Sequence, residues 1–415
     1  MTDPQALLRA MFDRAVAVAD PMRTLAAHLP ERPARLMVVG AGKASARMAE
    51  AVEAAWGPCA GLVITRYGYA RPCKGIEIVE AAHPVPDAAS AEATRRMLDL
   101  LKPLGPDDVV LALISGGGSA LLTAPAGGIT LEEKQLLTED LLASGAPIGD
   151  INGIRKQLSA VKGGGLAAAA YPARVHALLI SDVPGDDPGD IASGPTVGHD
   201  GDAARALATL DRWGVTPPPT IRAWLEQGAD PISQGDPRLR TTHNTVIAAP
   251  AQSLAAAAEM ADGLDVEILG DAIEGEARDV AADHAQMALE RQRRLTRPLI
   301  LLSGGELTVT RRGEGTGGPN AEYALALAIS LNGAPGIHAI ACDTDGVDGA
   351  AEVAGALIGP ETLKATPRNA QVALEDNDAH GYFAAAGAQV ITGPTLTNVN
   401  DFRAILIQPA EAPHA

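Results

Sequence analysis

The chain has little cysteine and no long apolar run. Its three cysteines, Cys59, Cys73 and Cys342, are widely spaced and odd in number, which excludes a disulfide framework. No C-x-x-C or H-x-x-x-H spacing is present, so a structural zinc site is not expected. No run of about 18 apolar residues could span a bilayer, and residues 1–20 lack the apolar core of a signal peptide. These absences predict a cytoplasmic protein.

Basic and aromatic residues are also scarce. Lys and Arg number 33 against 51 Asp and Glu, which gives a formal net charge of -18. Such a charge argues against sequence-independent binding to nucleic acid or to an anionic membrane, and it requires any anionic substrate to be bound by local cations. Aromatic residues make up only 3%, so Ala, Val, Leu and Ile must fill the core.

Apolar strand-like runs alternate with helical segments along most of the 415 residues. This alternation predicts an α/β protein with two α/β/α domains and largely parallel sheets. The polar, helix-breaking residues 235–237 favour a boundary between an N-terminal Rossmann-like domain, residues 1–235, and a C-terminal α/β domain, residues 236–415. Residues 5–29 are expected to be a helix, and a strand at 245–248 is expected to begin the second alternation.

A glycine-rich turn, S-G-G-G-S at 115–119, follows the apolar strand predicted at 109–114. Backbone N–H groups in such a turn, together with the N-terminus of a following helix, can bind an anion. A tight turn without a ligand is the alternative. The spacing is not that of a Walker P-loop. The letters L-[IL]-S-G-G recur at 301–305, either because each domain presents one glycine loop to a shared cleft or by coincidence.

An earlier turn, V-V-G-A-G-K-A-S at 38–45, resembles the start of a dinucleotide-binding fingerprint, but Ser45 replaces the third glycine. Lys43 stands where a helix should begin. A lysine there suits contact with a phosphate better than a solvent-facing role, because that end of a helix disfavours a cation. His83, in a proline-rich turn, is equally consistent with a base, a substrate contact or a hydrogen-bonded loop residue.

Further charged residues are candidates for ligand binding. One region contains polar and positively charged groups, Asn152, Arg155, Lys156 and Lys162, although a solvated helix face has the same pattern. Asp182, Asp186, Asp187 and Asp190 follow the strand at 175–180. These aspartates could hold Mg²⁺ or take a proton from a hydroxyl group, and some of them could simply form turns. An acidic loop at 343–349 lacks the glutamate of a calcium loop and favours a Mg²⁺ or ribose contact.

Taken together, these motifs resemble a known family. V-V-G-A-G-K-A-S (38–45), L-I-S-G-G-G-S-A-L-L (113–122), I-N-G-I-R-K-Q-L-S-A-V-K-G-G-G-L (151–166), L-I-S-D-V-P-G-D (179–186) and I-A-S-G-P-T (191–196) are similar to the N-terminal region of class II glycerate 2-kinases. S-G-G-E-L-T-V (303–309), G-G-P-N-A-E (317–322), T-D-G-V-D-G (344–349) and T-G-P-T-L-T-N-V-N-D (392–401) are similar to its C-terminal MOFRL domain.

The resemblance implies ATP-dependent phosphorylation of D-glycerate to 2-phospho-D-glycerate, with Mg²⁺, in a cleft between two α/β domains. It implicates Lys43 in catalysis. The family usually has an arginine where this chain has Pro319, and Arg311 or Arg312 is a candidate to replace its charge. A small-molecule substrate and a nucleotide are the expected partners, and a homodimer is left open.

The residues then take the following predicted roles. The catalytic residues are Lys43, Asp182 and Asp190. The substrate-binding residues are Arg155, Lys156, Ser181 and Ser193. The nucleotide-binding residues are Gly42, Ser115, Gly116, Gly117, Gly118, Ser119, Gly305, Glu306, Gly318 and Asn320. The metal-binding residues are Asp182, Asp343 and Asp345.

Two other functions are weighed against the kinase. Some family members are named hydroxypyruvate reductases, from an association with tartrate degradation. An NAD(P)H-dependent reductase is disfavoured here because the single fingerprint is broken at Ser45. No acidic residue ends the next strand, 63–66, to bind an NAD ribose, although Arg66 could suit a 2′-phosphate. A non-catalytic sensor of a sugar acid or nucleotide is the second alternative.

Overall fold

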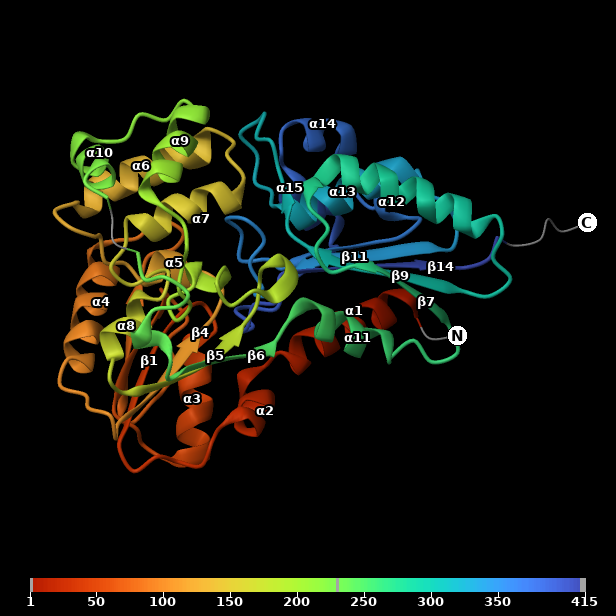
Figure 1. The fold of residues 1–415 in the computed structure, drawn as a ribbon. Helices are drawn as coiled ribbons and strands as arrows, with labels where there is room; N and C mark the ends of the chain where they lie inside the picture. Colours follow the sequence, from red (N-terminus) through yellow and green to blue (C-terminus); the bar gives the residue numbers. More distant parts are fainter. Residues whose placement is uncertain (1–2, 229–230, 411–415) are drawn as a thin grey trace, which may run out of the picture. The chain divides into compact units, whose positions relative to one another are not determined.

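The first sheet of the chain places β1 beside β4, although these strands are not consecutive. The computed structural model describes residues 3–228 and 231–410, and this sheet has the order β3-β2-β1-β4-β5-β6 (Figure 1). The strands are β1 Leu36–Ala41, β2 Gly61–Arg66, β3 Ile76–Ala81, β4 Val109–Ile114, β5 Arg174–Ile180 and β6 Thr242–Ala248. The pairs from β3 to β5 are parallel, which confirms the parallel sheet predicted for this region.

Helices connect the strands of this sheet and cover it. Every residue of β4 is buried, as expected for a central strand of a parallel sheet. The helices are α2 Pro21–Thr24, α3 Ser45–Trp56, α4 Ala88–Leu101, α5 Gly118–Leu121, α6 Leu131–Ala143, α7 Ile148–Gln157, α8 Gly165–Ala170, α9 Ala203–Arg212 and α10 Pro219–Glu226. Helices α6, α7, α9 and α10 share a separate apolar cluster that includes Leu137, Ile154, Leu210 and Leu225.

The second sheet has the order β13-β12-β11-β14-β9-β7 and is mostly antiparallel. Its strands are β7 Asp265–Gly270, β9 Leu299–Gly305, β11 Ile337–Asp343, β12 Gly355–Ile358, β13 Gln389–Val390 and β14 Asp401–Ile407, and β8 Gly275–Glu276 pairs separately with β10 Leu307–Thr308. The expectation of a largely parallel sheet is wrong here. The chain passes from β11 to β12 through a loop, without the helical crossover that parallel neighbours need.

Helices lie on both faces of this second sheet, as predicted for an α/β/α domain (Figure 1). Neighbouring strand residues alternate between two apolar cores. Ile300 packs with α1 Pro4–Val18 and α11 Pro250–Ala258, whereas Leu301 packs with α12 Ala277–Gln292 and α13 Pro319–Leu331. The remaining helices are α14 Ala370–Glu375 and α15 Ala379–Ala386.

The chain divides into two units. One contains Pro21–Asp182 and Asp186–Ile247, and the other contains the residues up to Asp20, Val183–Gly185 and those from Ala248 onward. The predicted division between residues 235 and 236 differs from this at both ends of the first unit. The helix expected at 5–29 is interrupted after Val18, and its first part packs with the C-terminal sheet. Strand β6 is the edge of the first sheet and does not begin the second.

Within the described ranges, no helix combines the length and the apolar character needed to cross a bilayer.

Candidate active site

The strand order of the first sheet defines a place for a ligand. The chain moves outward from β1 to β3 and then returns to place β4 on the other side of β1. In open α/β sheets, ligands bind beyond the carboxyl ends of the strands at such a reversal. Ala41 and Ile114, the last residues of β1 and β4, are aligned partners. The turn containing Lys43 and the glycine turn at 115–119 therefore leave the sheet side by side.

Hydrogen bonds join these two turns. The N–H of Lys43 donates to the carbonyl of Gly116 at 2.8 Å, and the N–H of Ala44 donates to Ser115 Oγ at 3.0 Å. Glycine is required at position 42, because a Cβ atom there would lie 2.1 Å from Ser115 Oγ. The turn at 38–45 is thus held by the turn at 115–119. The N–H groups of Lys43 and Ala44 are already used in these hydrogen bonds.

The side chains of Lys43 and His83 lie over Gly117. A Cβ atom at Gly117 would lie 3.0 Å from His83 Nε2 and 3.1 Å from Lys43 Cγ, and the backbone there has a φ of 76°. Both side chains are half-buried. Within residues 3–228 and 231–410, the N–H groups of Gly116 and Gly117 have no hydrogen-bond acceptor. A half-buried cation and two available N–H donors therefore meet at one place.

The helix expected after this turn is short. α5 spans only Gly118–Leu121, so the N-terminus of this helix adds little of the positive charge expected to help bind an anion. The turn at 115–119 instead contacts another segment through Ser119. Its hydroxyl lies 2.9 Å from Ser193 Oγ, which in turn donates to Asn152 Oδ1 on α7 at 3.4 Å. This brings Ser193, a predicted substrate-binding residue, to the glycine turn.

The Ser193 segment has an unusual backbone. Ala192 and Ser193 have φ values of 52° and 63°, in the left-handed region that residues other than glycine rarely adopt. Such conformations cost about 1–3 kcal/mol each and persist where the surroundings impose them. The segment is held by the N–H of Gly163, which donates to the carbonyl of Ser193 at 3.0 Å. This hydrogen bond and the contact between the two hydroxyls hold Ser193 beside Ser119 in spite of the strain.

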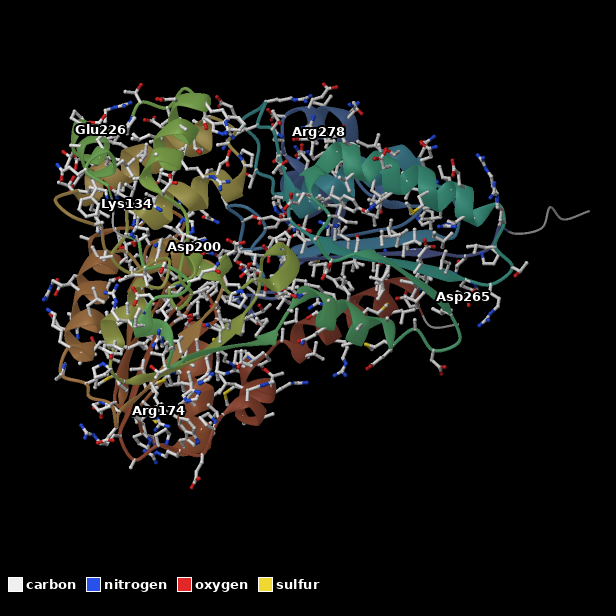
Figure 2. The ribbon with its side chains drawn as sticks, viewed as in Figure 1. Lys134, Arg174, Asp200, Glu226, Asp265 and Arg278 are labelled. Atoms are coloured by element: carbon white, nitrogen blue, oxygen red, sulfur yellow. The ribbon has the colours of Figure 1, made fainter. Side chains whose placement is uncertain are left out.

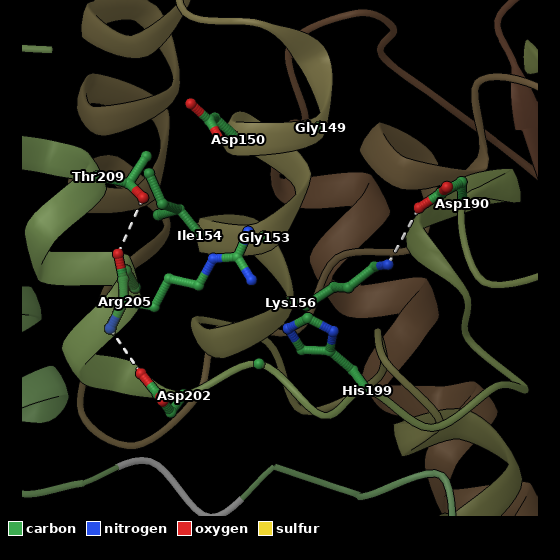
Figure 3. A pocket seen from close by; sticks show the side chains of 12 residues that line it. Gly149, Asp150, Gly153, Ile154, Lys156, Asp190, His199, Asp202, Arg205 and Thr209 are labelled. Carbon is green, nitrogen blue, oxygen red and sulfur yellow. Dashed lines mark hydrogen bonds and ion pairs between the residues drawn. The ribbon is translucent and has the colours of Figure 1, made fainter. Parts of the chain in front are cut away.

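Lys156 and Asp190 form a pair of their own. Lys156 Nζ lies 3.2 Å from Asp190 Oδ1, and both residues line a pocket of about 230 Å³ together with His199 and Arg205 (Figure 3). Among the described residues, those lining this pocket include neither Lys43 nor the turn at 115–119. The structure therefore joins two predicted residues to each other at a separate pocket.

Ser181 and Asp182 extend directly from β5, which is paired with β4. Because the two strands are parallel, both residues leave the sheet at the same edge as the turn at 115–119. Ser181 is buried and Asp182 is half-buried. This position fits a carboxylate acting near the glycine turn.

In the C-terminal unit, a carboxylate of the protein itself occupies the N-terminus of α13. Asp348 accepts hydrogen bonds from the N–H groups of Asn320, at 2.9 Å, and Ala321, at 2.8 Å. A Cβ atom at Gly318 would lie 2.4 Å from Asp348 Cγ, and Asn320 is only 1% exposed. Pro319 begins the helix, as predicted. The nucleotide contacts of Gly318 and Asn320 stay predictions.

The second S-G-G sequence is part of a strand. Gly304 and Gly305 end β9 and pair with β14, whereas Glu306 is exposed. Arg403, buried on β14, donates to the carbonyl of Gly304 at 2.6 Å and to Asp401 Oδ2 at 3.0 Å. Burial raises the pKa of Asp401 to about 6. The repeated letters at 115–117 and 303–305 thus form different structures.

The acidic loop after β11 is largely hydrogen-bonded to itself. Asp343 Oδ1 accepts the N–H of Asp345 at 2.9 Å, and the fully buried Asp345 accepts the N–H of Val347 at 2.8 Å. No group of three or more His, Cys, Asp or Glu side chains among the described residues is placed to hold a metal ion. Magnesium sites commonly use only one or two protein carboxylates plus substrate phosphates, so the metal contact of Asp182 also stays a prediction. The metal contacts of Asp343 and Asp345 stay predictions.

Two family models match the chain. A domain of unknown function, DUF4147, matches residues 7–226, and the MOFRL family matches residues 299–401. A protein of Agrobacterium vitis with the provisional name hydroxypyruvate reductase is 50% identical over 414 residues, which cover 97% of this chain and 94% of that protein. D-Glycerate 2-kinase of Thermotoga maritima is 38% identical over 415 residues, 97% of this chain and 98% of that protein. A crystal structure of glycerate kinase from Thermotoga maritima matches with a TM-score of 0.85 and 36% identity, over 97% of this chain and 99% of that chain.

Proposed function

The chain belongs to the DUF4147–MOFRL family of glycerate 2-kinases, and we propose that it transfers the γ-phosphoryl group of ATP to the 2-hydroxyl group of D-glycerate. This proposal rests on one observation: the Lys43 side chain lies over Gly117, beyond the carboxyl ends of β1 and β4. Phosphoryl transfer requires positive charge and N–H donors around the phosphate oxygens, and both are present there.

The proposed reaction is an in-line displacement. The 2-hydroxyl oxygen forms a bond to the γ-phosphorus, the bond from that phosphorus to the β–γ bridging oxygen breaks, and ADP leaves. Lys43 and the N–H groups of Gly116 and Gly117 stabilise charge on the transferred group. Asp182 accepts the hydroxyl proton, because it leaves the sheet at the same edge as the glycine turn.

Residues on α7 and in the segment after β5 are proposed to hold the substrate. Arg155 and Lys156 are proposed to attract the glycerate carboxylate. Ser193 is proposed to hydrogen-bond to the substrate, which is supported by its contact with Ser119 of the glycine turn. Asp190 orients Lys156 through their ion pair. Mg²⁺, held by Asp182 and the phosphates of the nucleotide, would neutralise charge on those phosphates. Gly305 and Glu306 remain predicted nucleotide contacts.

A reductase activity is the alternative, on the name of the Agrobacterium vitis relative. A dinucleotide-binding fold uses the N–H groups of its first turn to bind the pyrophosphate. In this chain the N–H groups of Lys43 and Ala44 already donate to Gly116 and Ser115. The geometry therefore favours the kinase.

One assay tests the proposal. The purified protein is incubated with D-glycerate, ATP and Mg²⁺, and the product is identified by ³¹P and ¹H NMR. We expect 2-phosphoglycerate. Formation of 3-phosphoglycerate would contradict the site of transfer. Absence of any phosphorylated product, together with hydroxypyruvate-dependent loss of NADH or NADPH, would overturn the class of reaction.

A further inference from the structure

Three cations lie close enough to influence one another in the helical part of the first unit. Lys134 lies on α6, Arg155 lies on α7, and Lys162 follows α7 (Figure 2 labels Lys134). Lys134 is 5% exposed and Lys162 is 2% exposed, whereas Arg155 is half-buried. In a chain with a net charge of -18, such a concentration of buried positive charge is unusual.

No carboxylate neutralises these cations among the residues that the structure describes. Lys134 Nζ has no hydrogen-bond partner, and Lys162 Nζ donates to the carbonyl of Leu122 at 2.8 Å. Burial and the charge of Arg155 lower the pKa of Lys134 to about 8. Burial and the two other cations lower the pKa of Lys162 well below its usual value. Buried charges are normally paired, so these cations lack the negative counter-charge that a bound anion would supply.

The cluster adjoins the glycine turn. Leu122, which accepts the hydrogen bond from Lys162, directly follows α5, the helix that carries Ser119. Asn152 lies three residues before Arg155, on the same face of α7, and it accepts the hydrogen bond from Ser193. The face of α7 that carries Arg155 is thus also the face that contacts the Ser119–Ser193 pair.

We propose that Lys134, Arg155 and Lys162 form the oxyanion site for a bound reactant. Arg155, the most exposed of the three, contacts the anion directly, since a guanidinium matches a carboxylate or a phosphate with two parallel hydrogen bonds. Lys134 and Lys162 supply the charge behind it. The identity of the anion, the glycerate carboxylate or a nucleotide phosphate, rests on the proposed function; the presence of an anion site does not.

The decisive variant is Lys134→Met, which keeps the length of the side chain and removes its charge. We expect the melting temperature of the unliganded protein to rise, because a buried ammonium group without a partner is removed. We also expect KM to increase about tenfold, because the anion loses the attraction of one buried positive charge, with a smaller change in kcat. A residue with only a structural role would lower the melting temperature and leave KM unchanged.

The two sources of the anion are distinguished by which KM changes. An increase in the KM for D-glycerate identifies its carboxylate, and an increase in the KM for ATP identifies a phosphate. Lys102→Met is the matched control, because Lys102 is exposed and paired with Asp99. This control should leave both KM values and the melting temperature unchanged.

Direct binding separates this proposal from the kinase assignment. Calorimetric titrations of D-glycerate, ATP and inorganic phosphate into wild-type protein, Lys134→Met and Lys162→Met require no turnover. Weaker binding of at least one anion by both variants supports the site, even if no phosphoglycerate is formed. Equal affinities in wild type and Lys134→Met for all three anions would overturn it.

Discussion

The hydroxyl oxygens of Ser119 and Ser193 lie 2.9 Å apart, although 74 residues separate them in the chain. Ser119 belongs to the glycine turn after β4, and Ser193 belongs to a segment with left-handed backbone after β5. Their contact joins the turn proposed to bind phosphates to the segment proposed to bind glycerate. It therefore gives a direct test of whether the two act as one site.

Removing the Ser193 hydroxyl should lower kcat/KM for D-glycerate. Ser193→Ala leaves the backbone conformation equally unfavourable, so it isolates the hydroxyl group. We expect a loss of about tenfold, as for one hydrogen bond in a preorganised site. A double-mutant cycle with Ser119→Ala should give a coupling energy of about 0.5–3 kcal/mol. Strictly additive losses would show that the two hydroxyls do not act together.

Replacing Lys43 should mainly lower kcat. Lys43→Met removes the charge that we place on the transferred phosphoryl group, and loss of one such stabilising group typically costs about 10²-fold or more in kcat. The KM for D-glycerate should change little, because the interaction strengthens in the transition state. Lys74→Met, at an exposed position, is the control. Near-normal turnover by Lys43→Met would remove this residue from the mechanism.

The glycine turn itself is tested by comparing two glycines. Gly117 and Gly68 have φ values of 76° and 84°, so alanine strains the backbone similarly at both, by about 1 kcal/mol. Only at Gly117 would the added Cβ atom meet Lys43 and His83; at Gly68 it meets open space. Gly117→Ala should reduce kcat at least tenfold beyond any effect of Gly68→Ala. Equal kcat values would place the reacting groups away from this turn.

Local patterns predicted the first sheet and its turns well. The apolar run before Ser115 and the glycines after it are sufficient for a buried strand and a tight turn, because both depend on neighbouring residues. The same letters at Ser303 form a strand, since β14 pairs with them. That pairing joins residues about 100 positions apart, and no local pattern contains it. The antiparallel C-terminal sheet and the Ser119–Ser193 contact were beyond prediction for the same reason.

One missed residue did leave a signal in the sequence. Lys134 precedes Leu137 and Leu141 by three and seven residues, which places it on the apolar face of α6. A lysine on the apolar face of a helix usually keeps its ammonium group in solvent, so a buried one indicates a functional or pairing role. The structure shows it buried.

The pH dependence of stability should contain the titration of His284. This residue is 5% exposed, and its Nδ1 lies 2.8 Å from the Tyr323 hydroxyl. Burial, with a smaller effect of Arg403, lowers its pKa from 6.5 to about 4 in the folded state. As the pH falls through this range, the unfolded chain takes up a proton that the folded protein does not. The free energy of unfolding therefore falls, by at most about 3 kcal/mol from this group.

His284→Asn keeps a polar atom for Tyr323 and removes the titration. Chemical denaturation between pH 7 and pH 4 should show a smaller loss of stability for this variant than for wild type, so that the two curves approach each other as the pH falls. His28→Asn, in an exposed position, should follow the wild-type curve. A wild-type slope in His284→Asn would show that His284 is protonated in the folded protein as readily as in the unfolded chain, and would contradict the lowered pKa.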